Sequence, residues 1–434
     1  MRHTVFGLLS CCAAAAWSAE GLTPMGAEQA GNADGTIPEW TGGLTPMQWP
    51  RDFHDGGRLL DPWPGDAPRL VITADNWRDY ASKLSAGHVA LFQRDHDYRM
   101  AVYPTRRSVA FPEEIEAATA ANRARAALKG ADAVTGASLG VPFPEPRSGA
   151  EVLWNHRLRY RGDAAEWRYR RAAVFEGRAP HLERALELRL AGYASLQPGK
   201  VSPAMHSYNL LRMEPAEELP DYTVLWHDAV DILATPRRIW GRTSAWKAYR
   251  APPLGYDQVG IFSYRIRYFD MMDMFSGAFD RYVFKLVGKE ERFVPYNSFR
   301  LANAGAEVLG PRHLAGDAAR YELHRVWIVE ATVRPGEGHP LRQRVFYVDE
   351  DSWSIVMADD YDAQGRLDRF QEGHLLPLYP IQAVDYAPAV TYDFPGKRYY
   401  VDRWLSDSPP PQLHPALRPS DFQPAVTGRA YRMN

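Results

Sequence analysis

The sequence has almost no cysteine. Its two cysteines, Cys11 and Cys12, both lie within the first apolar stretch, "TVFGLLSCCAAAAW". This stretch follows a short polar start and leads into small residues at positions 16–19, a pattern typical of an export signal. We therefore expect residues 1–19 to be a signal peptide that is cleaved near positions 16–19. A chain cleaved there contains no disulfide bond and depends on its apolar core for stability.

A second interpretation of the leader stays open. The sequence "LLSC" at Leu8–Cys11 loosely resembles a bacterial lipoprotein box. In that case Cys11 would become the lipidated first residue and anchor the chain to a membrane. The Ala-rich tract that continues to Ala19 favours ordinary cleavage instead.

The sequence also lacks long apolar runs and an excess of one charge. No later run approaches the ~20 apolar residues of a membrane-spanning helix, so we expect a soluble periplasmic protein. The formal net charge is -2, from 51 Lys and Arg against 53 Asp and Glu. Such a balance gives no overall attraction to nucleic acid or acidic lipid, and we expect no nucleic-acid partner.

Motifs for catalysis, metal binding or phosphate binding are absent from the sequence. It contains no HExxH, no GxSxG and no glycine loop with phosphate-binding spacing. We expect no catalytic residue, no metal and no cofactor. His324 lies in an alternating run and is interpreted as a packed structural residue.

Acidic residues gather at positions 349–351 and 359–362. Neighbouring residues of a strand point to opposite faces, so these acids do not form a facing catalytic pair. The sequence "DDYDAQG" fits a calcium loop only in part. We expect these acids to lie at turns and strand edges.

Aromatic residues make up 12% of the sequence and hydrophobic residues 45%, enough for a large core. Residues 20–68 are rich in Gly, Pro and Trp and show no periodicity. Gly35 can adopt a turn, whereas Ile37 and Trp40 favour docking over exposure to water. We expect this segment to wrap the domain as an ordered ribbon; the alternative is a disordered leader.

The remaining sequence predicts a single mainly β domain with some α structure. Helical spacing is found at 73–93, 112–129 and 150–158, and short alternating runs begin near residue 163. A four-strand antiparallel meander is expected from Tyr321. Its first strand is apolar on both faces, so we expect cover on both faces. The predicted domain is a large curved antiparallel sheet or incomplete β-barrel over 69–376, followed by a Pro-rich wrapping tail over 377–434.

Three runs interleave arginine with aromatic residues: "HRLRYRG" (156–162), "WRYRR" (167–171) and "RRIWGR" (237–242). They are interpreted either as solvated strand faces or as anchors for an anionic head group such as a carboxylate or phosphate. Export and the near-zero net charge argue against nucleic acid as their ligand.

Six long motifs resemble one proteobacterial family of periplasmic domains of unknown function, often labelled outer-membrane lipoprotein-sorting-like. They occur in order over nearly all of the expected mature chain: "LTPMGAEQAGNADGTIPEWTGG" (22–43), "VYPTRRSVAFP" (102–112), "GVPFPEPRSGAEVLWNHRLRYRG" (140–162), "LVGKEERFVPYNSF" (286–299), "RYELHRVWIVEATVRPG" (320–336) and "RVFYVDEDSWSIVMADDYDAQG" (344–365).

The resemblance implies an incomplete barrel wrapped around helices, as in the lipoprotein carriers LolA and LolB. It also implies an RND-type exporter and an outer-membrane-associated protein as partners, and it supplies no catalytic residues. An open barrel leaves an apolar trough that suits a lipid chain. The expected lining consists of aromatic residues from predicted strands and the 150–158 helix: Trp154, Trp226, Trp240, Phe284, Trp327 and Phe346.

The sequence therefore favours a periplasmic carrier or adaptor for a hydrophobic molecule, without chemistry of its own. Two alternatives remain open. Converging acids in a cleft would indicate a hydrolase of a periplasmic polymer or ester. A solid core with an apolar surface patch would indicate a structural component of an export complex.

The leader gives the first prediction. N-terminal sequencing of the exported protein should find a first residue in the neighbourhood of positions 16–19. A mature form that begins at a lipidated Cys11 and partitions with membranes would contradict it.

Overall fold

The computed structural model describes residues 21–216, 221–243, 249–250 and 263–424. The expected signal peptide, including Cys11, lies outside the described residues. Among the residues that are described, we find no helix with the length and apolar content needed to span a bilayer.

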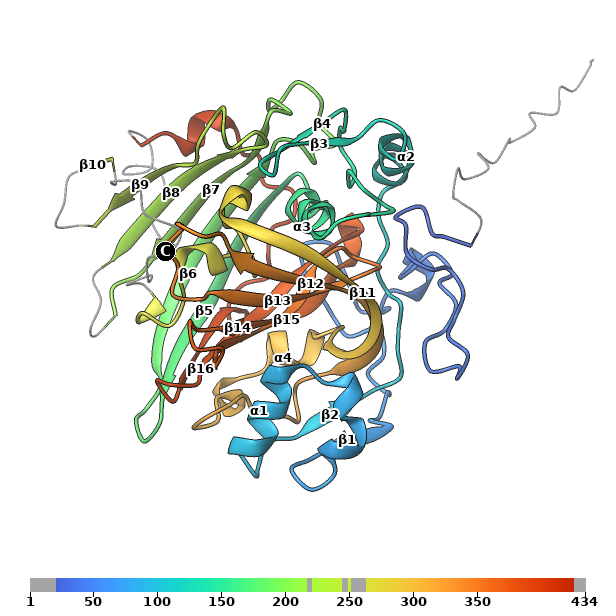
Figure 1. Ribbon diagram of the computed structural model, residues 1–434, viewed down its shortest axis with the longest axis vertical. Helices are drawn as coiled ribbons and strands as arrows, with labels where there is room; N and C mark the ends of the chain where they lie inside the picture. Colours follow the sequence, from blue (N-terminus) through green and yellow to red (C-terminus); the bar gives the residue numbers. More distant parts are fainter. Residues whose placement is uncertain (1–20, 217–220, 244–248, 251–262, 425–434) are drawn as a thin grey trace, which may run out of the picture.

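One sheet of 15 strands forms the body of the protein (Figure 1). Two antiparallel meanders make up most of it, β5–β10 and β12–β17, and β11 pairs with β12. The strands are β1 (Leu70–Ile72), β2 (Met100–Val102), β5 (Ala164–Phe175), β6 (His181–Ala191), β7 (Met205–Met213), β8 (Tyr222–Ala229), β9 (Arg238–Arg242), β10 (Tyr249–Arg250), β11 (Tyr282–Pro295), β12 (Tyr321–Val333), β13 (Gln343–Asp349), β14 (Ile355–Tyr361), β15 (Leu367–Leu378), β16 (Ala383–Asp393) and β17 (Arg398–Trp404).

The two meanders join where β17 pairs with β5. Tyr399 lies opposite Val174, and Val401 lies opposite Ala172. Over the described ranges no ladder connects β10 to β11, so the curved sheet does not close into a barrel. The expected fold class, a mainly β protein with a large incomplete barrel and few helices, is confirmed.

Both faces of the β11–β15 region are covered, as the apolar pattern of β12 predicted. On one face, helix α3 (Gly149–Leu158) lies so close that a Cβ on Gly149 would stand 2.8 Å from Cγ1 of Val329. On the other face, helix α1 (Ala86–Arg94) packs on Phe370, and a Cβ on Gly87 would stand 2.1 Å from that ring. Glycine allows each helix to approach the sheet.

The expected helix 73–93 is divided in two. A 3-10 helix (Trp77–Lys83) is followed by α1, whose N-cap Ser85 accepts a hydrogen bond from the backbone N–H of His88. Asp359 accepts hydrogen bonds from the backbone N–H groups of Ala86 and Gly87, the two residues that follow Ser85. These oxygens start a new helix at this point because they satisfy its first donors.

The expected helix 112–129 is shorter in the structure. Helix α2 spans Glu113–Asn122, and the side-chain amide of Asn122 donates to the backbone carbonyls of Ser138 and Val141. The chain then forms a small hairpin, β3 (Ala127–Lys129) and β4 (Ala133–Thr135). Gly130 has φ +64° and lies in the hairpin turn. A fourth helix, α4, spans Phe299–Asn303.

The N-terminal segment 21–68 is an irregular ribbon that lies against the domain. Ile37 is 1% exposed, and Gly35 has φ +67° in the adjoining turn. Trp40 is half-buried, and its indole N–H donates to the carbonyl of Val109 at 3.1 Å. Arg107 fixes the ribbon from the domain side, donating to the backbone carbonyls of residues 28 and 29.

The C-terminal region differs from the expected wrapping tail. β15 runs on to Leu378, and β16 and β17 are full members of the sheet. The prolines suggested a wrapping chain, but Pro388 lies at a register shift between β15 and β16, where the ladder is interrupted. The β-branched and aromatic residues on either side determine the structure. Only residues after Trp404 leave the sheet, and Leu417 and Phe422 pack on its outer side.

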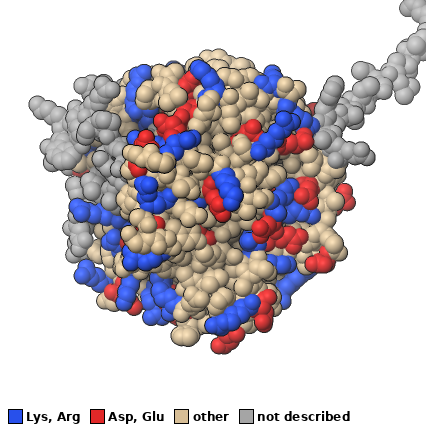
Figure 2. All heavy atoms as spheres, in the orientation of Figure 1, with Lys and Arg blue, Asp and Glu red and all other residues tan. Residues whose placement is uncertain are grey.

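Figure 2 shows basic and acidic side chains interspersed over one face of the molecule, with no large area of a single sign. This distribution agrees with the small net charge of the sequence. It gives this face no broad electrostatic attraction to a polyanion.

The ribbon gives the second prediction. Ile37→Ala should lower the free energy of unfolding by about 2–5 kcal/mol, because a buried side chain is removed from a packed contact. Trp40→Ala should cost less, about 1–2 kcal/mol, because the ring is only half-buried. Chemical denaturation measures both. Met47→Ala is the matched control, since Met47 is 97% exposed in the same ribbon. A midpoint unchanged in Ile37→Ala would show that the ribbon does not pack on the domain.

Candidate functional site

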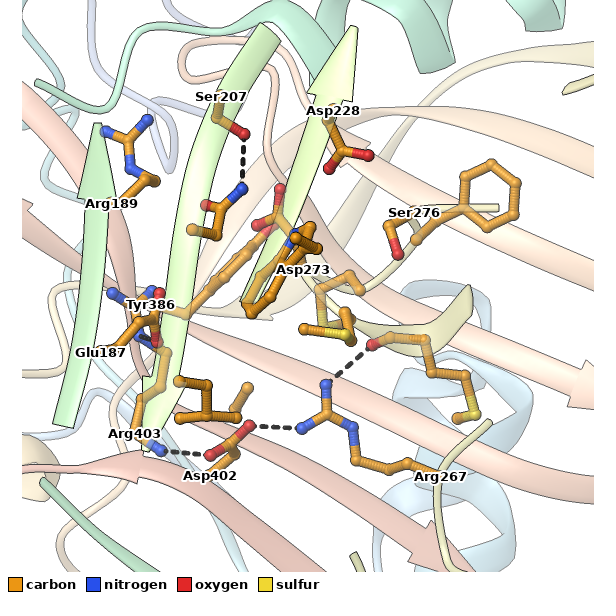
Figure 3. Close-up of a pocket in the computed structure, with 18 of the residues that line it drawn as sticks. Glu187, Arg189, Ser207, Asp228, Arg267, Asp273, Ser276, Tyr386, Asp402 and Arg403 are labelled. Atoms are coloured by element: carbon orange, nitrogen blue, oxygen red, sulfur yellow. Dashed lines mark hydrogen bonds and ion pairs between the residues drawn. The ribbon is translucent and has the colours of Figure 1, made fainter. Parts of the chain in front are cut away.

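A cavity lies between strands β5–β8 and the irregular segment 267–276 (Figure 3), which we call the front wall of the cavity. The C-terminal end of α3 and strands β15–β17 supply the remaining walls. It encloses about 980 Å³ of empty space, counting the part that opens to solvent.

The alternation of β6–β8 sends polar residues into the cavity and apolar residues away from it. Arg189, Asn209 and Asp228 face inward. Leu188 and Leu210, neighbours of the first two, face outward. The outward leucines pack with the C-terminal Leu417 and Phe422, so the sheet is covered on the outside by the chain's own end. We call the inward-facing side of these strands the inner face.

The inner face changes from polar to apolar along the strands. Register places Ser207 beside Asp228, followed by a row formed by Arg189, Asn209 and Trp226. The next row places Leu211 beside Val224, and the last described row contains Met213. One surface thus carries charged groups at one end and aliphatic groups at the other.

A second compartment of about 540 Å³ continues from the apolar end. It shares Leu211, Trp226 and Met272 with the first cavity. Its other apolar walls are Met213, Val224, Tyr268 and Phe269. Methionine side chains adapt their shape to a neighbour more readily than branched residues do. The two compartments together can hold a molecule with one polar and one apolar part.

The carboxylates of the cavity are held by arginines. Asp273 accepts hydrogen bonds from Arg159, and Asp402 accepts one from Arg267. In Figure 3, Arg267 lies between Asp402 and the backbone carbonyl of Met271. Burial opposes ionisation of both carboxyl groups, but the facing guanidinium groups outweigh it and keep their pKa values below the usual range.

Asp228 shows the same balance. Arg237 holds it with hydrogen bonds of 2.6 and 3.1 Å. Burial raises the pKa of Asp228, whereas Arg237 and Arg157 lower it further, so the net shift is downward. These three acids are therefore ionised and engaged at neutral pH.

Arg189 is the exception among the cavity arginines. Its guanidinium donates to two backbone carbonyls, those of Arg161 at 2.6 Å and Gly162 at 2.8 Å. Within the described chain it has no carboxylate partner. The side chain is buried, and burial together with the nearby guanidinium of Arg161 lowers the pKa of Arg189 to about 10; the carboxylates of Asp385 and Asp273, neither of them in an ion pair with Arg189, offset this only in part.

The six aromatic residues expected to line a trough are dispersed. Trp226 lines both compartments. Trp154 is fully buried and stacks on Phe279, and Phe346 is fully buried against Phe275. Phe284 belongs to this same core cluster. Aromatic composition alone does not distinguish a core ring from a cavity wall.

The two remaining tryptophans also lie away from the cavity. Trp327 stacks on Trp353 under the ammonium group of Lys289. Trp240 packs against His227 in the outer cluster of the sheet. The trough therefore remains a proposal that, among these six residues, rests on Trp226.

The arginine–aromatic runs proved more informative than the aromatic residues alone. Each run supplies residues to the cavity wall: Arg157 and Arg161 from the first, Tyr169 from the second and Arg237 from the third. Sequence reasoning missed Arg189, because its strand alternates leucine with charge and resembles one with a solvent-exposed face. It also missed the methionines of 271–274, which belong to no periodic element.

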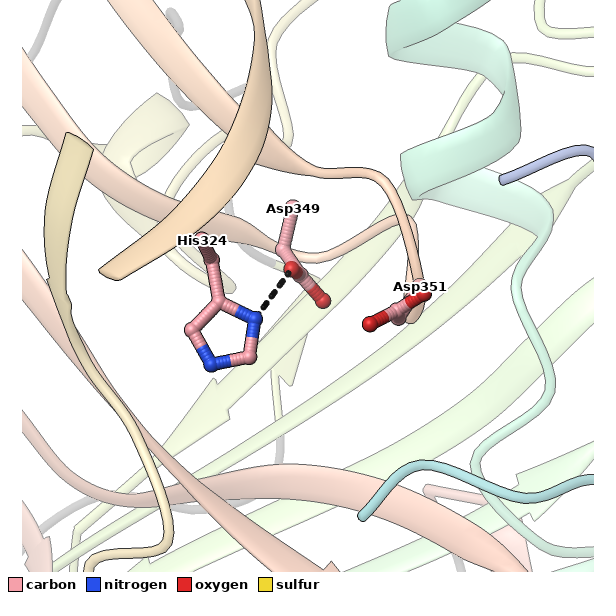
Figure 4. Close-up of side chains that lie close together, drawn as sticks. All are labelled: His324, Asp349 and Asp351. Atoms are coloured by element: carbon pink, nitrogen blue, oxygen red, sulfur yellow. Dashed lines mark ion pairs between the residues drawn. The ribbon is translucent and has the colours of Figure 1, made fainter. Parts of the chain in front are cut away.

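The acids at 349–351 are buried, which corrects their interpretation as edge residues. Figure 4 shows His324, Asp349 and Asp351 close together, with ligand atoms all within 4.8 Å of one another. Both oxygens of Asp351 are occupied by Arg107, at 2.6 and 3.0 Å. Only Asp349 and His324 then remain as donors, too few for a metal site. We interpret the cluster as a structural network that fixes the N-terminal ribbon through Arg107.

The environment of Asp349 is unusual. One oxygen accepts hydrogen bonds from Ser352 and Tyr296, whereas the other accepts no hydrogen bond and lies 3.7 Å from Nδ1 of His324 (dashed line in Figure 4). Nε2 of His324 donates to the carboxylate of Glu322, which can only accept. Burial, and then repulsion by Asp351, raise the pKa of Asp349 to about 6.

The acids at 359 and 360 are also fully buried, and they point to opposite faces as expected. Asp359 caps α1 on one side of the sheet. Asp360 binds Arg344 on the other side, where Arg344 also binds Asp270 of the segment before the cavity. Their roles are structural, since each is engaged with a backbone or guanidinium partner.

The family model described as "Protein of unknown function (DUF1329)" matches residues 71–426. The chain belongs to this family. An uncharacterized protein of Pseudomonas aeruginosa is 36% identical over 387 residues, covering 87% of this chain and 84% of that protein. These matches confirm the family resemblance that the six motifs indicated.

Three solved structures align with part of this chain at low similarity. A DUF1329 family protein from Desulfovibrio piger aligns with a TM-score of 0.42 and 12% identity, covering 60% of this chain and 90% of that one. A putative outer membrane lipoprotein-sorting protein domain from Vibrio parahaemolyticus gives 0.45 and 11%, covering 65% and 98%. A LolA superfamily protein from Nitrosomonas europaea gives 0.37 and 11%, covering 64% and 98%. These likenesses are too low to carry an argument about function.

The pKa of Asp349 gives the third prediction. Its folded value of about 6 exceeds the ordinary value of 3.8, so the folded state binds this proton more tightly. The associated stability is complete below about pH 4 and is lost as the pH rises through 6, a loss of up to about 3 kcal/mol. Asp349→Asn keeps an acceptor and adds an N–H toward His324. Its unfolding free energy should therefore fall less than that of the wild type between pH 4 and 7.

Urea denaturation across this pH range measures the difference. Asp317→Asn is the control, because that side chain is 92% exposed. Identical pH profiles for Asp349→Asn and the wild type would contradict the assignment.

Proposed function

We propose that the protein is a periplasmic carrier or adaptor for a hydrophobic, lipid-like molecule. The molecule binds in the two joined compartments between the inner face of β5–β8 and segment 267–276. The observation that carries this proposal is the apolar compartment around Leu211, Met213 and Val224, which shares wall residues with a larger polar cavity. Periplasmic location follows from the expected signal peptide. The partners, an RND-type exporter and an outer-membrane-associated protein, follow from the family resemblance alone.

The arrangement of the acids favours a carrier over a hydrolase. Hydrolysis of a glycoside or ester requires a group that gives or takes a proton near neutral pH. Asp228, Asp273 and Asp402 are instead held by arginines, with pKa values below their usual range. We therefore propose that the protein is not an enzyme. The cavity also favours a carrier over a purely structural component, which would have a solid core.

The cover of the cavity suits reversible binding. The front wall, segment 267–276, contains Met271, Met272 and Met274 and has only short helical turns. Side chains of this kind can rearrange around a guest without disturbing a ladder of the sheet. Movement of this wall would admit and release the molecule.

The fourth prediction tests the apolar compartment. Trp226→Glu should abolish binding of the lipophilic probe N-phenyl-1-naphthylamine while the protein stays folded, because a carboxylate in the apolar wall repels the probe but can be hydrated when the cavity is empty. Trp327→Glu is the matched control: Trp327 is also half-buried, lies outside both compartments and is close to Lys289, which can pair with the new carboxylate. Probe fluorescence and thermal melting are measured on the same samples.

Equal probe binding in Trp226→Glu and the wild type would place the site elsewhere. Mass spectrometry of an organic extract of the natively expressed protein complements this test. A recurrent lipophilic molecule in the extract would support the carrier. Strong hydrolysis of a lipid or glycan ester by the purified protein would favour the hydrolase instead.

A further inference from the structure

Arg189 lacks the acidic partner that the other cavity arginines have. Arg161 pairs with Asp385 at 2.8 Å, Arg237 with Asp228 at 2.6 Å and Arg267 with Asp402 at 2.5 Å. Two further lining arginines are paired as follows: Arg157 with Asp228 at 4.0 Å and Arg403 with Asp385 at 2.7 Å. Arg189 contacts only backbone carbonyls, although its side chain is 6% exposed.

The cavity as a whole also has more arginines than carboxylates. Its lining contains six arginines and four carboxylates, Glu187, Asp228, Asp273 and Asp402, and a fifth carboxylate, Asp385, pairs with two of the arginines from behind the lining. Glu187 does not compensate Arg189, because it accepts from the hydroxyl of Tyr169 and lies 3.5 Å from Arg403. A buried charge without a partner is costly, and an anion is the group that would compensate it.

Neutral donors adjoin Arg189 on the inner face. Asn209 lies directly across from it on β7 and donates to Ser207 at 2.8 Å. Figure 3 shows Arg189 and Ser207 at the same end of the cavity, well away from the Arg267–Asp402 pair. A guanidinium flanked by an amide and a hydroxyl is suited to a carboxylate or phosphate.

The apolar compartment lies at a defined distance from this group. Asn209 stands in the row of Arg189, and Met213 of the apolar compartment follows four residues later on β7. At ~3.3 Å per residue, the two are separated by roughly 13 Å along the strand. Leu211 lies between these two rows, and Trp226 stands in the row of Arg189; both residues line both compartments.

We propose that the ligand is an anionic amphiphile. Its carboxylate or phosphate binds Arg189, and its apolar chain runs past Leu211 and Trp226 into the compartment around Met213. This inference rests on the proposed carrier function and specifies the chemical class of the molecule carried. In this arrangement Arg189 of β6 binds the anion, while the other lining arginines keep their carboxylate partners.

The fifth prediction uses three probes with the same chain: laurate, lauryl phosphate and lauryl alcohol. The wild-type protein should bind the two anions roughly ten- to a hundredfold more tightly than the alcohol, the range expected for a hydrogen bond to a charged group. Arg189→Met should remove this preference and leave alcohol binding unchanged. Arg189→Lys should keep part of it. Isothermal titration calorimetry provides the affinities.

Arg366→Met is the matched control. Its side chain is 76% exposed and pairs locally with Asp362, so its loss should not alter the preference. Thermal melting shows whether each variant is folded. If Arg189→Met does not fold, the comparison of anion and alcohol on the wild type and on Arg189→Lys decides the question.

Several outcomes would overturn the inference. Equal affinity of the wild type for alcohol and anions would contradict the anionic head group. An undiminished preference for anions in folded Arg189→Met would contradict the role of Arg189. Neither result would contradict the proposed carrier function. Inorganic phosphate that binds as tightly as lauryl phosphate would indicate a site for a free anion. If none of the three lauryl probes binds, both the anionic head group and the proposed carrier function are contradicted.

Discussion

The pairing of β17 with β5 is the contact on which the cavity depends. It joins residues 398–404 to 170–175, more than half the chain away, and turns two meanders into one sheet. The inner face of β5–β8 is thereby brought beside residues of β16 and β17, including Tyr386 and Arg403. Without this ladder the arginines of the first meander would lie on an ordinary solvent-exposed surface. A long-range pairing of this kind is closed late and at an entropic cost, so its strands must be strongly β-forming.

Ion pairs, rather than a ladder, hold the front wall of the cavity. Asp270 binds Arg344, Asp273 binds Arg159 and Arg267 binds Asp402, so segment 267–276 is attached to β13, to the end of α3 and to β17. Buried pairs of this kind contribute little net stability, but losing one partner is costly. They fix the position of an irregular segment without fixing every backbone hydrogen bond. A wall built this way can remain in place yet yield locally to a guest.

The sequence predicted the fold class, the four-strand meander β12–β15 and helix α3, because each depends on local periodicity. It did not predict β16 and β17, because the prolines at 377 and 388 outweighed the aromatic runs beside them in the pattern. It placed the acids at 349–351 and 359–360 on edges, since nothing local reveals that Arg107 and Arg344 meet them from distant segments. A charged side chain can be buried when an oppositely charged partner meets it. A local sequence pattern contains only one member of such a pair, so it does not predict the burial.

The inner face of β6–β8 shows the same limit for the candidate site. Alternation of leucine with charged residues predicts one apolar face and one polar face, but the polar face can border either bulk solvent or an enclosed cavity. The arginine–aromatic runs pointed to three cavity arginines, whereas Arg189 stood in a run without aromatics. What distinguishes Arg189 is that its neighbours are compensated and it is not. Under the proposed carrier function, an anion that pairs with Arg189 would stabilise the folded state as well as occupy the site. The same guanidinium would then supply selectivity for an anionic ligand.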